Sequence, residues 1–474
     1  MLPLCATPSC DTCASRPPVT ILEGECMKIS FIRPAMMGGK AGDAMEPRVF
    51  GILAALTPAG VECVLHDERV APVPLDEPTD LAALTVDTFS ARRAYQLAVE
   101  YHRRGVPVVM GGPHPTLLPE EALCFASSVV IGDAEGAWPK VVEDAQAGRL
   151  QRRYENRFPS LADSRVDRRL FGARDYCPIA LVEFGRGCPH ACDFCSVHAV
   201  YGSGIRQRPV ADVVAELAGL DGRHVLFTDD NLLGGARAVG ELLAALRSLR
   251  RRWSCQASLE VATDARTLEA MAASGCVAVT VGFESLVPEN LEQMNKAWNT
   301  RHGRFADLVA RFRDHGIMVY GMFIFGYDYD TPDVFHRTVE FAVEAKLFLA
   351  SFGPLAPTPG TGLYERLRQE KRLVHPRWWL DPRYRYGDAL FHPRQMTAEQ
   401  LAEGCYRARM QFNSVGNTLR RALDWRANAG SPAKLGVYVA GNLIARREIG
   451  RKQGQPLGTG EPLETVFGEL PACD

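Results

Sequence analysis

Short apolar runs and longer amphipathic stretches alternate along the first third of the chain. The apolar runs predict strands, and the amphipathic stretches between them predict helices. The predicted strands are 28–32, 61–65, 81–86, 106–110 and 129–131, and the predicted helices are 47–56, 91–104, a short one from 119, and 138–147. Strands that alternate with helices are typical of an α/β fold with a doubly wound parallel sheet.

The same rhythm returns after a polar connection at 150–177 that is rich in Arg and Asp. The predicted strands are 179–184, 225–228, 254–259, 278–281, 319–325 and 349–352, and the predicted helices are 210–220, 236–251, 265–274, 303–315 and 332–346. Six such β/α units fit a partial (β/α)6 barrel. The groups that carry chemistry in a barrel lie at the carboxyl ends of its strands.

The two ends of the chain do not follow this rhythm. Residues 1–26 predict a flexible extension, and the carboxyl-terminal part predicts a mainly helical extension with a helix at 398–412. At 419–452 eight basic residues stand against two acidic ones. This stretch either docks on the barrel or touches a membrane surface or a lipid substrate. The expected parts are an extension at 1–26, an α/β domain at 27–150, a barrel at 175–362 and an extension at 363–474.

Composition narrows the class of protein. The 474 residues are 46% hydrophobic and 23% charged, with a formal net charge of −2. This balance argues against a nucleic-acid binder, which normally carries a basic excess. Fourteen cysteines are few for a disulfide scaffold of this length, and neither a secretory leader nor an uncharged apolar run of about 18 residues is visible. We therefore expect a cytoplasmic protein with reduced thiols and no transmembrane segment.

Three cysteines with the spacing C-x3-C-x2-C are the main chemical signal. Cys188, Cys192 and Cys195 follow the strand predicted at 179–184, and Phe194 precedes the last of them. Three thiolates in a short loop can hold three irons of a [4Fe–4S] cube and leave the fourth iron open for a small molecule. The alternative is structural zinc with His190 or His198, but no second ligand pair follows nearby.

This cysteine motif resembles the radical S-adenosylmethionine (SAM) superfamily. The resemblance implies that the open iron chelates SAM and that an electron from the cluster cleaves it to a 5′-deoxyadenosyl radical. It also implies that Asp229, Asp230 and Asn231, after the strand at 225–228, and Glu284 and Ser285, after the strand at 278–281, help to hold SAM. Phe194 and the backbone near Leu355 are expected beside the adenine. In the alternative interpretation Asp229 or Asp230 only caps the next helix, and Gln256 and Ser258 are either polar barrel contacts or satisfied core groups.

The first domain resembles the cobalamin-binding Rossmann domain that precedes many radical SAM barrels. The resemblance rests on Gly111, Gly112 and His114 after one predicted strand and on Gly132 after the next. Glycines at the carboxyl ends of parallel strands let a large ligand approach the backbone. The Asp-x-His-x-x-Gly motif of cobalamin domains with a histidine ligand is absent. Either cobalamin binds without that ligand, or the domain is structural or binds substrate.

The extension resembles that of hopanoid-type radical SAM enzymes. Its aromatic residues Trp378, Trp379, Tyr384 and Tyr386 either close the barrel over substrate or dock the extension on it. The amino-terminal Cys5, Cys10 and Cys13 are interpreted as incidental, although a second cluster, zinc or a thiophilic substrate would also suit them.

Together these features predict a radical SAM enzyme that methylates an unactivated carbon of a lipid or other natural product with a [4Fe–4S] cluster, SAM and possibly cobalamin. An electron donor such as flavodoxin or ferredoxin is the expected partner, and no nucleic acid is expected. A cobalamin-free radical SAM enzyme that catalyses cyclisation, carbon–carbon coupling or aminocarboxypropyl transfer remains the first alternative. A non-catalytic zinc-binding or ligand-sensing protein is the second.

Overall fold

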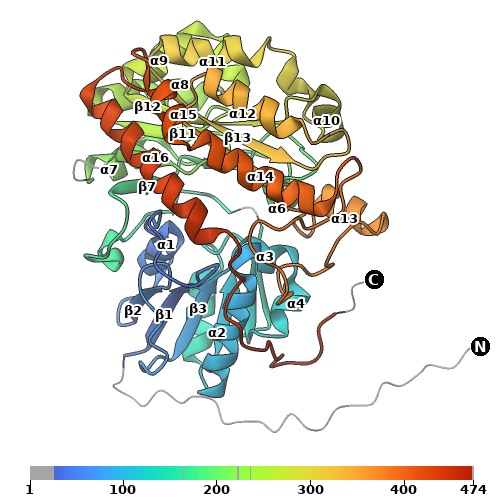
Figure 1. Cartoon of the computed structure of the whole chain (residues 1–474). Helices are drawn as coiled ribbons and strands as arrows, with labels where there is room; N and C mark the ends of the chain where they lie inside the picture. The colour runs from blue at the N-terminus through green and yellow to red at the C-terminus, as the bar shows by residue number, and fades with distance from the viewer. Residues whose placement is uncertain (1–25, 158, 163, 221–223, 235, 472–474) are drawn as a thin grey trace, which may run out of the picture.

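The chain forms two parallel sheets, one above the other, with a helical carboxyl-terminal part against both (Figure 1). The computed structural model describes residues 26–157, 159–162, 164–220, 224–234 and 236–471. Cys5, Cys10 and Cys13 and nearly all of the predicted extension at 1–26 lie outside these residues. Among the described residues, no helix is long and apolar enough to span a bilayer. The α/β class predicted from the pattern of apolar runs is confirmed.

The first sheet has six parallel strands in the order β2-β1-β3-β4-β5-β6. The strands are β1 Lys28–Arg33, β2 Glu62–Asp67, β3 Leu81–Thr85, β4 Val108–Gly111, β5 Ser128–Gly132 and β6 Arg153–Asn156. The helices are α1 Arg48–Leu56, η1 Thr88–Ser90, α2 Ala91–Arg103, α3 Pro113–Leu117, α4 Pro119–Leu123 and α5 Trp138–Gln146. Side chains of α1 and α5 form one buried cluster and those of α2 belong to another, so helices cover both faces of the sheet. This arrangement is the doubly wound sheet that the sequence predicts.

Strand β6 was not predicted. It lies within the stretch at 150–177 that we expected to be a polar connection, and it extends the first domain past residue 150. Only Tyr154 of its four residues is buried. A short edge strand with one buried side chain lacks the apolar run or alternation from which strands are predicted.

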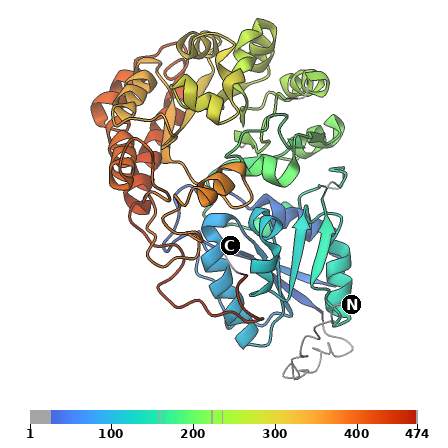
Figure 2. The ribbon, with the colours of Figure 1, turned by 90° about the vertical axis from the view of Figure 1, so that its right-hand side faces the viewer.

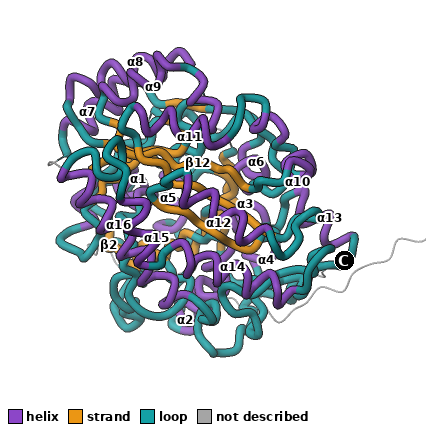
Figure 3. Tube along the Cα trace, turned by 45° about the horizontal axis from the view of Figure 1, so that its top comes forward, coloured by secondary structure: helices purple, strands orange, loops and turns teal. Residues whose placement is uncertain are grey.

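The second sheet has six parallel strands in the order β14-β13-β12-β11-β10-β7. The strands are β7 Ile179–Val182, β10 His224–Phe227, β11 Trp253–Gln256, β12 Cys276–Glu284, β13 Met318–Phe325 and β14 Leu349–Pro354. The helices between them include α7 Val210–Ala218, α8 Ala236–Leu249, η3 Leu259–Thr263, α9 Ala265–Ala273, α10 Pro288–Gln293, η4 Ala297–Thr300, α11 Phe305–Asp314 and α12 Val334–Glu344. These helices form an arc around the strands (Figures 2 and 3). Since β7 and β14 do not pair, the arrangement is an open six-unit barrel.

The carboxyl-terminal part packs on both sheets. Its helices are α13 Gly362–Gln369, α14 Ala398–Phe412, α15 Val415–Ala422 and α16 Pro432–Lys452. Helix α14 has the predicted bounds and packs against β14. Beyond α16 the chain runs along α2, where Arg92 and Gln96 donate to the carbonyl of Glu461 (Figure 1).

Four aromatic residues of this part stand out in the sequence: Trp378, Trp379, Tyr384 and Tyr386. The first three of them are buried. The Trp378 indole donates to the carbonyl of Pro357, and the Trp379 indole donates to Glu121 of α4. Tyr384 is buried against Trp378, and both Tyr384 and Tyr386 line a cavity. The geometry favours docking of the extension over closure of the barrel mouth for Trp378 and Trp379.

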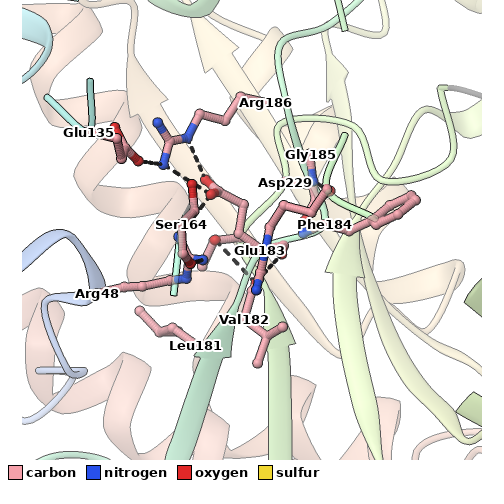
Figure 4. A network of polar contacts seen from close by, with 12 residues as sticks. Arg48, Glu135, Ser164, Leu181, Val182, Glu183, Phe184, Gly185, Arg186 and Asp229 are labelled. Carbon is pink, nitrogen blue, oxygen red and sulfur yellow. Dashed lines mark hydrogen bonds and ion pairs between the residues drawn. The ribbon is translucent and has the colours of Figure 1, made fainter. Parts of the chain in front are cut away.

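Ion pairs join the first sheet to the start of the barrel (Figure 4). Glu183, just after β7, accepts from Arg48 of α1 at 2.8 Å and from Arg186 at 2.8 Å. Arg186 also pairs with Asp133 and Glu135, which follow β5. Burial alone raises the pKa of Glu183, but Arg48 and Arg186 outweigh it and lower that pKa to about 2. The network therefore fixes the segment that leads into the three cysteines.

Candidate functional site

The three predicted cysteines lie on one loop at the carboxyl end of β7. The loop begins with β8 Gly185–Arg186, which pairs antiparallel with β9 Arg206–Gln207, and ends at α6 Ser196–Tyr201. Gly187 lies between them with φ +97°, and a Cβ there would overlap the carbonyl oxygen of Gly204. Only glycine suits both that conformation and that close approach.

The three cysteines are shielded from solvent to different extents. Cys192 is buried, and Cys188 and Cys195 are partly buried. Burial raises the pKa of the Cys188 thiol and raises that of Cys192 to about 12, so an electropositive partner is needed to keep them as thiolates. Among the described residues, no three Cys, His, Asp or Glu side chains are placed to hold one metal ion together. A [4Fe–4S] cube needs no such grouping, because each thiolate binds a different iron.

Asp229 and Asp230 hold the backbone of this loop. The Asp229 carboxylate accepts from the amides of Phe184 and Gly185, and Asp230 accepts from the amide of Gly187 at 2.8 Å. Burial raises the pKa of Asp229 to about 7, against the lowering effect of these amides. These contacts differ from the alternative helix cap, and the contact of the two acids with SAM stays a prediction. In the structure both acids position the cysteine loop.

Asn231 lies closer to the thiols. Its amide nitrogen donates to the Ser258 hydroxyl at 3.1 Å and lies 4.0 Å from the Cys188 sulfur. Gln256 is exposed and donates to the carbonyl of Asp230. Asn231 and Ser258 thus have hydrogen-bond partners beside the cysteine loop, while the Gln256 side chain remains exposed.

Glu284 ends β12 in a left-handed conformation, with φ +62°. Its carboxylate accepts from the ammonium group of Lys296 at 2.8 Å, and both side chains are about nine-tenths buried. Burial lowers the pKa of Lys296. Glu284 and Cys192 raise that pKa by a larger amount, so its net shift is upward. Ser285 accepts from the amide of Val287 at 3.1 Å, which begins the turn into α10.

Lys296 and Trp298 are site residues that the sequence reading missed. The Trp298 ring stacks on the His190 ring of the cysteine loop, with centroids 3.6 Å apart, and Lys296 lies 5.4 Å from the Trp298 centroid. A lone lysine and tryptophan carry no periodic or spacing signal. The only sequence hint was their position shortly after Glu284.

Phe194 and Leu355 lie at the two sides of the barrel opening. Phe194 packs partly buried against the core, and its neighbour Asp193 accepts from the Tyr327 hydroxyl at 2.6 Å. Leu355 is buried after β14, and its amide donates to Phe325. The structure therefore brings the cysteine loop, Asn231 and Glu284 to the same end of the second sheet.

The matched family model agrees with this geometry. Residues 182–342, from the end of β7 into α12, match the model of the radical SAM superfamily. A bacteriochlorophyllide d C-12(1)-methyltransferase from Chlorobaculum tepidum is 30% identical over 403 residues, which cover 81% of this chain and 87% of the relative. The chain belongs to the radical SAM superfamily. It is a radical SAM enzyme, and the superfamily uses a [4Fe–4S] cluster and SAM.

Other similar proteins include methyltransferases. A hopanoid C-2 methylase from Rhodopseudomonas palustris is 26% identical, with 70% of this chain and 66% of the relative covered. The structure of the radical SAM methyltransferase TsrM from Kitasatospora setae, with cobalamin and a [4Fe–4S] cluster bound, has a TM-score of 0.61 at 17% identity. The alignment covers 90% of this chain and 98% of that one. The two chains therefore share their fold over nearly the full length.

In this radical SAM enzyme, the predicted ligand-facing residues of the first sheet have internal partners. His114 is fully buried, with one ring nitrogen 3.1 Å from Glu121 and the other 3.4 Å from Thr88. A Cβ at Gly112 or Gly132, both with positive φ, would meet backbone of the protein itself, whereas one at Gly111 has ordinary contacts. Packing thus explains His114, Gly112 and Gly132 without a ligand.

The loop after β1 is more open. A Cβ at Gly38 or Gly39 would meet nothing within 4 Å. This loop lines two cavities of about 250 and 270 Å³ at the carboxyl edge of the first sheet. Sheets of this type bind ligands at that edge. The signal that could have identified the loop is its Gly38-Gly39 pair.

A larger, mainly apolar cavity of about 440 Å³ lies between the two edge strands of the open barrel. It is bounded by Ile179 of β7, by the whole of β14 and by the inner side of α16. Phe89, Tyr320 and Tyr386 contribute aromatic surface to it. The cavity reaches the carboxyl end of β14, the end at which the cysteine loop lies.

Proposed function

We propose that this protein is a cobalamin-dependent radical SAM methyltransferase that methylates an unactivated carbon of an apolar small molecule, a lipid or other natural product. The observation that carries the proposal is the cysteine loop, held at the carboxyl end of an open barrel by Asp229, Asp230 and Arg186. The methyltransferases among the relatives support the reaction class. An electron donor such as flavodoxin or ferredoxin, and a cytoplasmic location, complete the proposal.

The residues of the loop fit a [4Fe–4S] cluster. Cys188, Cys192 and Cys195 would hold it, and the Asn231 amide beside Cys188 would donate toward the thiolate sulfur. When bound, the cluster and SAM supply the electron and the carbon radical for hydrogen abstraction. The chain itself holds the loop through its backbone amides, and the buried Lys296 ammonium places a positive charge near the thiolates. That ammonium also donates to the Glu284 carboxyl group and orients it.

The first sheet fits cobalamin through the loop after β1. Gly38 and Gly39 leave room for a large ligand to approach the backbone, and the cavity of about 270 Å³ at this loop meets the large apolar cavity at shared residues such as Asp43 and Phe89. No histidine occurs at 34–47, and His114 is buried with Glu121. Cobalamin would therefore bind without a histidine ligand from these positions.

The cavity between β7 and β14 supports an apolar substrate. Ligand pockets are mainly apolar and aromatic, with a few polar groups that set orientation. Here Arg409 of α14 is the lining cation without a carboxylate partner among the described residues, while Lys452 pairs with Asp43. A substrate with one acidic group on an apolar body suits this lining.

The test is the metal, sulfide and corrinoid content of protein purified without oxygen, beside the variant Cys188→Ala/Cys192→Ala/Cys195→Ala. We expect about four irons per chain, their loss in the variant, and bound corrinoid. Incubation with a reductant, deuteromethyl SAM and candidate apolar acids should then give a product that carries the label. Iron without corrinoid, even after added cobalamin, would replace the proposal with a cobalamin-free radical SAM reaction. Zinc in place of iron would overturn both.

A further inference from the structure

The outer side of the last two helices is unusually apolar. Fourteen large apolar side chains are exposed among the described residues, and nine of them lie between Val415 and Ile444. Five of the nine are 62–75% exposed: Val415, Leu419, Leu423, Trp425 and Leu443. Single exposed apolar residues are ordinary, but a concentration of this kind marks an interaction surface. We call seven of the nine the α15–α16 face, these five together with Leu435 and Val439; Ile444 lines the apolar cavity instead, and Val437, seven positions before it, lies on the same side of α16 as Ile444.

Helical spacing places these side chains in stripes. Val415, Leu419 and Leu423 are four residues apart, as are Leu435, Val439 and Leu443 of α16. Positions four apart lie on one side of a helix. Between 432 and 444 the one charged residue is Lys434, which is half-buried and bonded to the carbonyl of Gly316. A surface helix normally carries polar residues on its outer side.

The inner sides of the same helices are firmly anchored. Arg421 is fully buried, donates to the carbonyls of Leu347 and Phe348, and bonds Asn442 of α16 at 2.9 Å. The Tyr438 hydroxyl donates to the carbonyl of Thr418, which joins α16 to α15. Because this inner network fixes the orientation of both helices (Figure 1), the apolar stripes are held outward.

The exposed charges carried by residues 413–447 are all positive, and one of them, Arg426, pairs with Asp314 of α11. Arg420, Arg446 and Arg447 are exposed and have no carboxylate partner among the described residues. The single acid from 413 to 447 is Asp424, which is buried and paired with Arg313. A second copy of the same face would bring like charges together, which disfavours self-association. An anionic lipid surface would complement them.

We propose that the α15–α16 face docks on an anionic membrane. Leu419, Leu423 and Leu443 would enter the boundary between head groups and acyl chains, and Trp425 would lie at head-group level, where tryptophan is enriched. The arginines would lie against lipid phosphates. Binding is peripheral, since no described helix can span a bilayer. The apolar cavity lies directly behind α16, at Gly441, Ala445 and Ile449.

Vesicle flotation tests this surface independently of the methyl transfer reaction. The iron-loaded protein is mixed with vesicles of phosphatidylcholine, alone or with a minority of phosphatidylglycerol. We expect binding to the mixed vesicles, little binding to phosphatidylcholine, and release by salt. Leu419→Gln/Trp425→Gln/Leu443→Gln should weaken binding more than tenfold. Arg446→Gln/Arg447→Gln should also weaken it about thirtyfold, at roughly 1 kcal/mol per arginine.

Matched controls separate docking from misfolding. Arg169→Gln/Arg383→Gln removes two exposed arginines elsewhere and should bind as the wild type does. Every variant should retain its iron. Equal binding by the wild type and the triple apolar variant would overturn the proposal, as would failure of the wild type to float with mixed vesicles. A wild-type dimer that the triple variant converts to monomers, without lipid binding, would assign the face to a second copy instead.

Discussion

At the scale of single residues, the Glu284–Lys296 ion pair is the contact whose disruption should cost the most stability. Both side chains are about nine-tenths buried, and Glu284 has a left-handed backbone that only a well-supported site retains. Removing one partner of a buried pair leaves an uncompensated charge, which costs more than the pair contributes. Lys296 is therefore both a structural requirement and a positive charge that acts on the thiol of Cys192.

Lys296→Met should lower the free energy of unfolding by roughly 3 kcal/mol or more, because it strands the Glu284 carboxylate. Adding Glu284→Gln should recover a large part of this loss, since the stranded charge is then removed. Urea unfolding of iron-free protein measures both values. Arg407→Met, which removes an exposed pair, should cost less than about 1 kcal/mol. A double variant as unstable as the sum of its two single variants would contradict this account.

At the scale of elements, the cysteine loop between β8 and β9 depends on glycine at one position. Gly187→Ala should prevent the loop from closing, because its Cβ would overlap the Gly204 carbonyl and φ is +97°. We expect iron per chain to fall several-fold after anaerobic reconstitution. Gly204→Ala is the matched control, since its Cβ would meet nothing within 4 Å. Equal iron in both variants would show that the loop accommodates the methyl group.

The elements that the sequence predicted are those with a local periodic signal. The strands of both sheets and helix α14 follow from such patterns, whereas β6 has one buried residue and no pattern. The cysteine spacing is equally local. The partners of Asp229 and Asp230, in contrast, are amides more than 40 positions earlier in the chain. Roles that arise from such long-range contacts become visible only when the barrel brings the segments together.

At the scale of the whole molecule, the two sheets are joined through the segment that leads to the cluster loop. Glu183 accepts from Arg48 of the first domain and from Arg186, and Arg186 also pairs with Glu135 beyond β5 (Figure 4). A ligand at the edge of the first sheet and the cysteine loop therefore share one rigid connection. The stability of the molecule should depend on the ionisation of Glu183.

The pKa of Glu183 is about 2 in the folded protein and near 4.5 as a free side chain. A lowered pKa contributes stability that is fully present above pH 4.5 and is lost as the pH falls toward 2. Glu183→Gln should be about 3 kcal/mol less stable than wild type at pH 7, because Arg48 and Arg186 lose their shared carboxylate. The deficit should shrink steadily below pH 4.5, where the unfolded wild-type chain takes up a proton at Glu183 and the folded protein does not. Urea unfolding of iron-free protein from pH 7 to pH 3 measures it, with the exposed Glu143→Gln as control. A deficit that stays constant across this range would show that the carboxylate does not act through its charge.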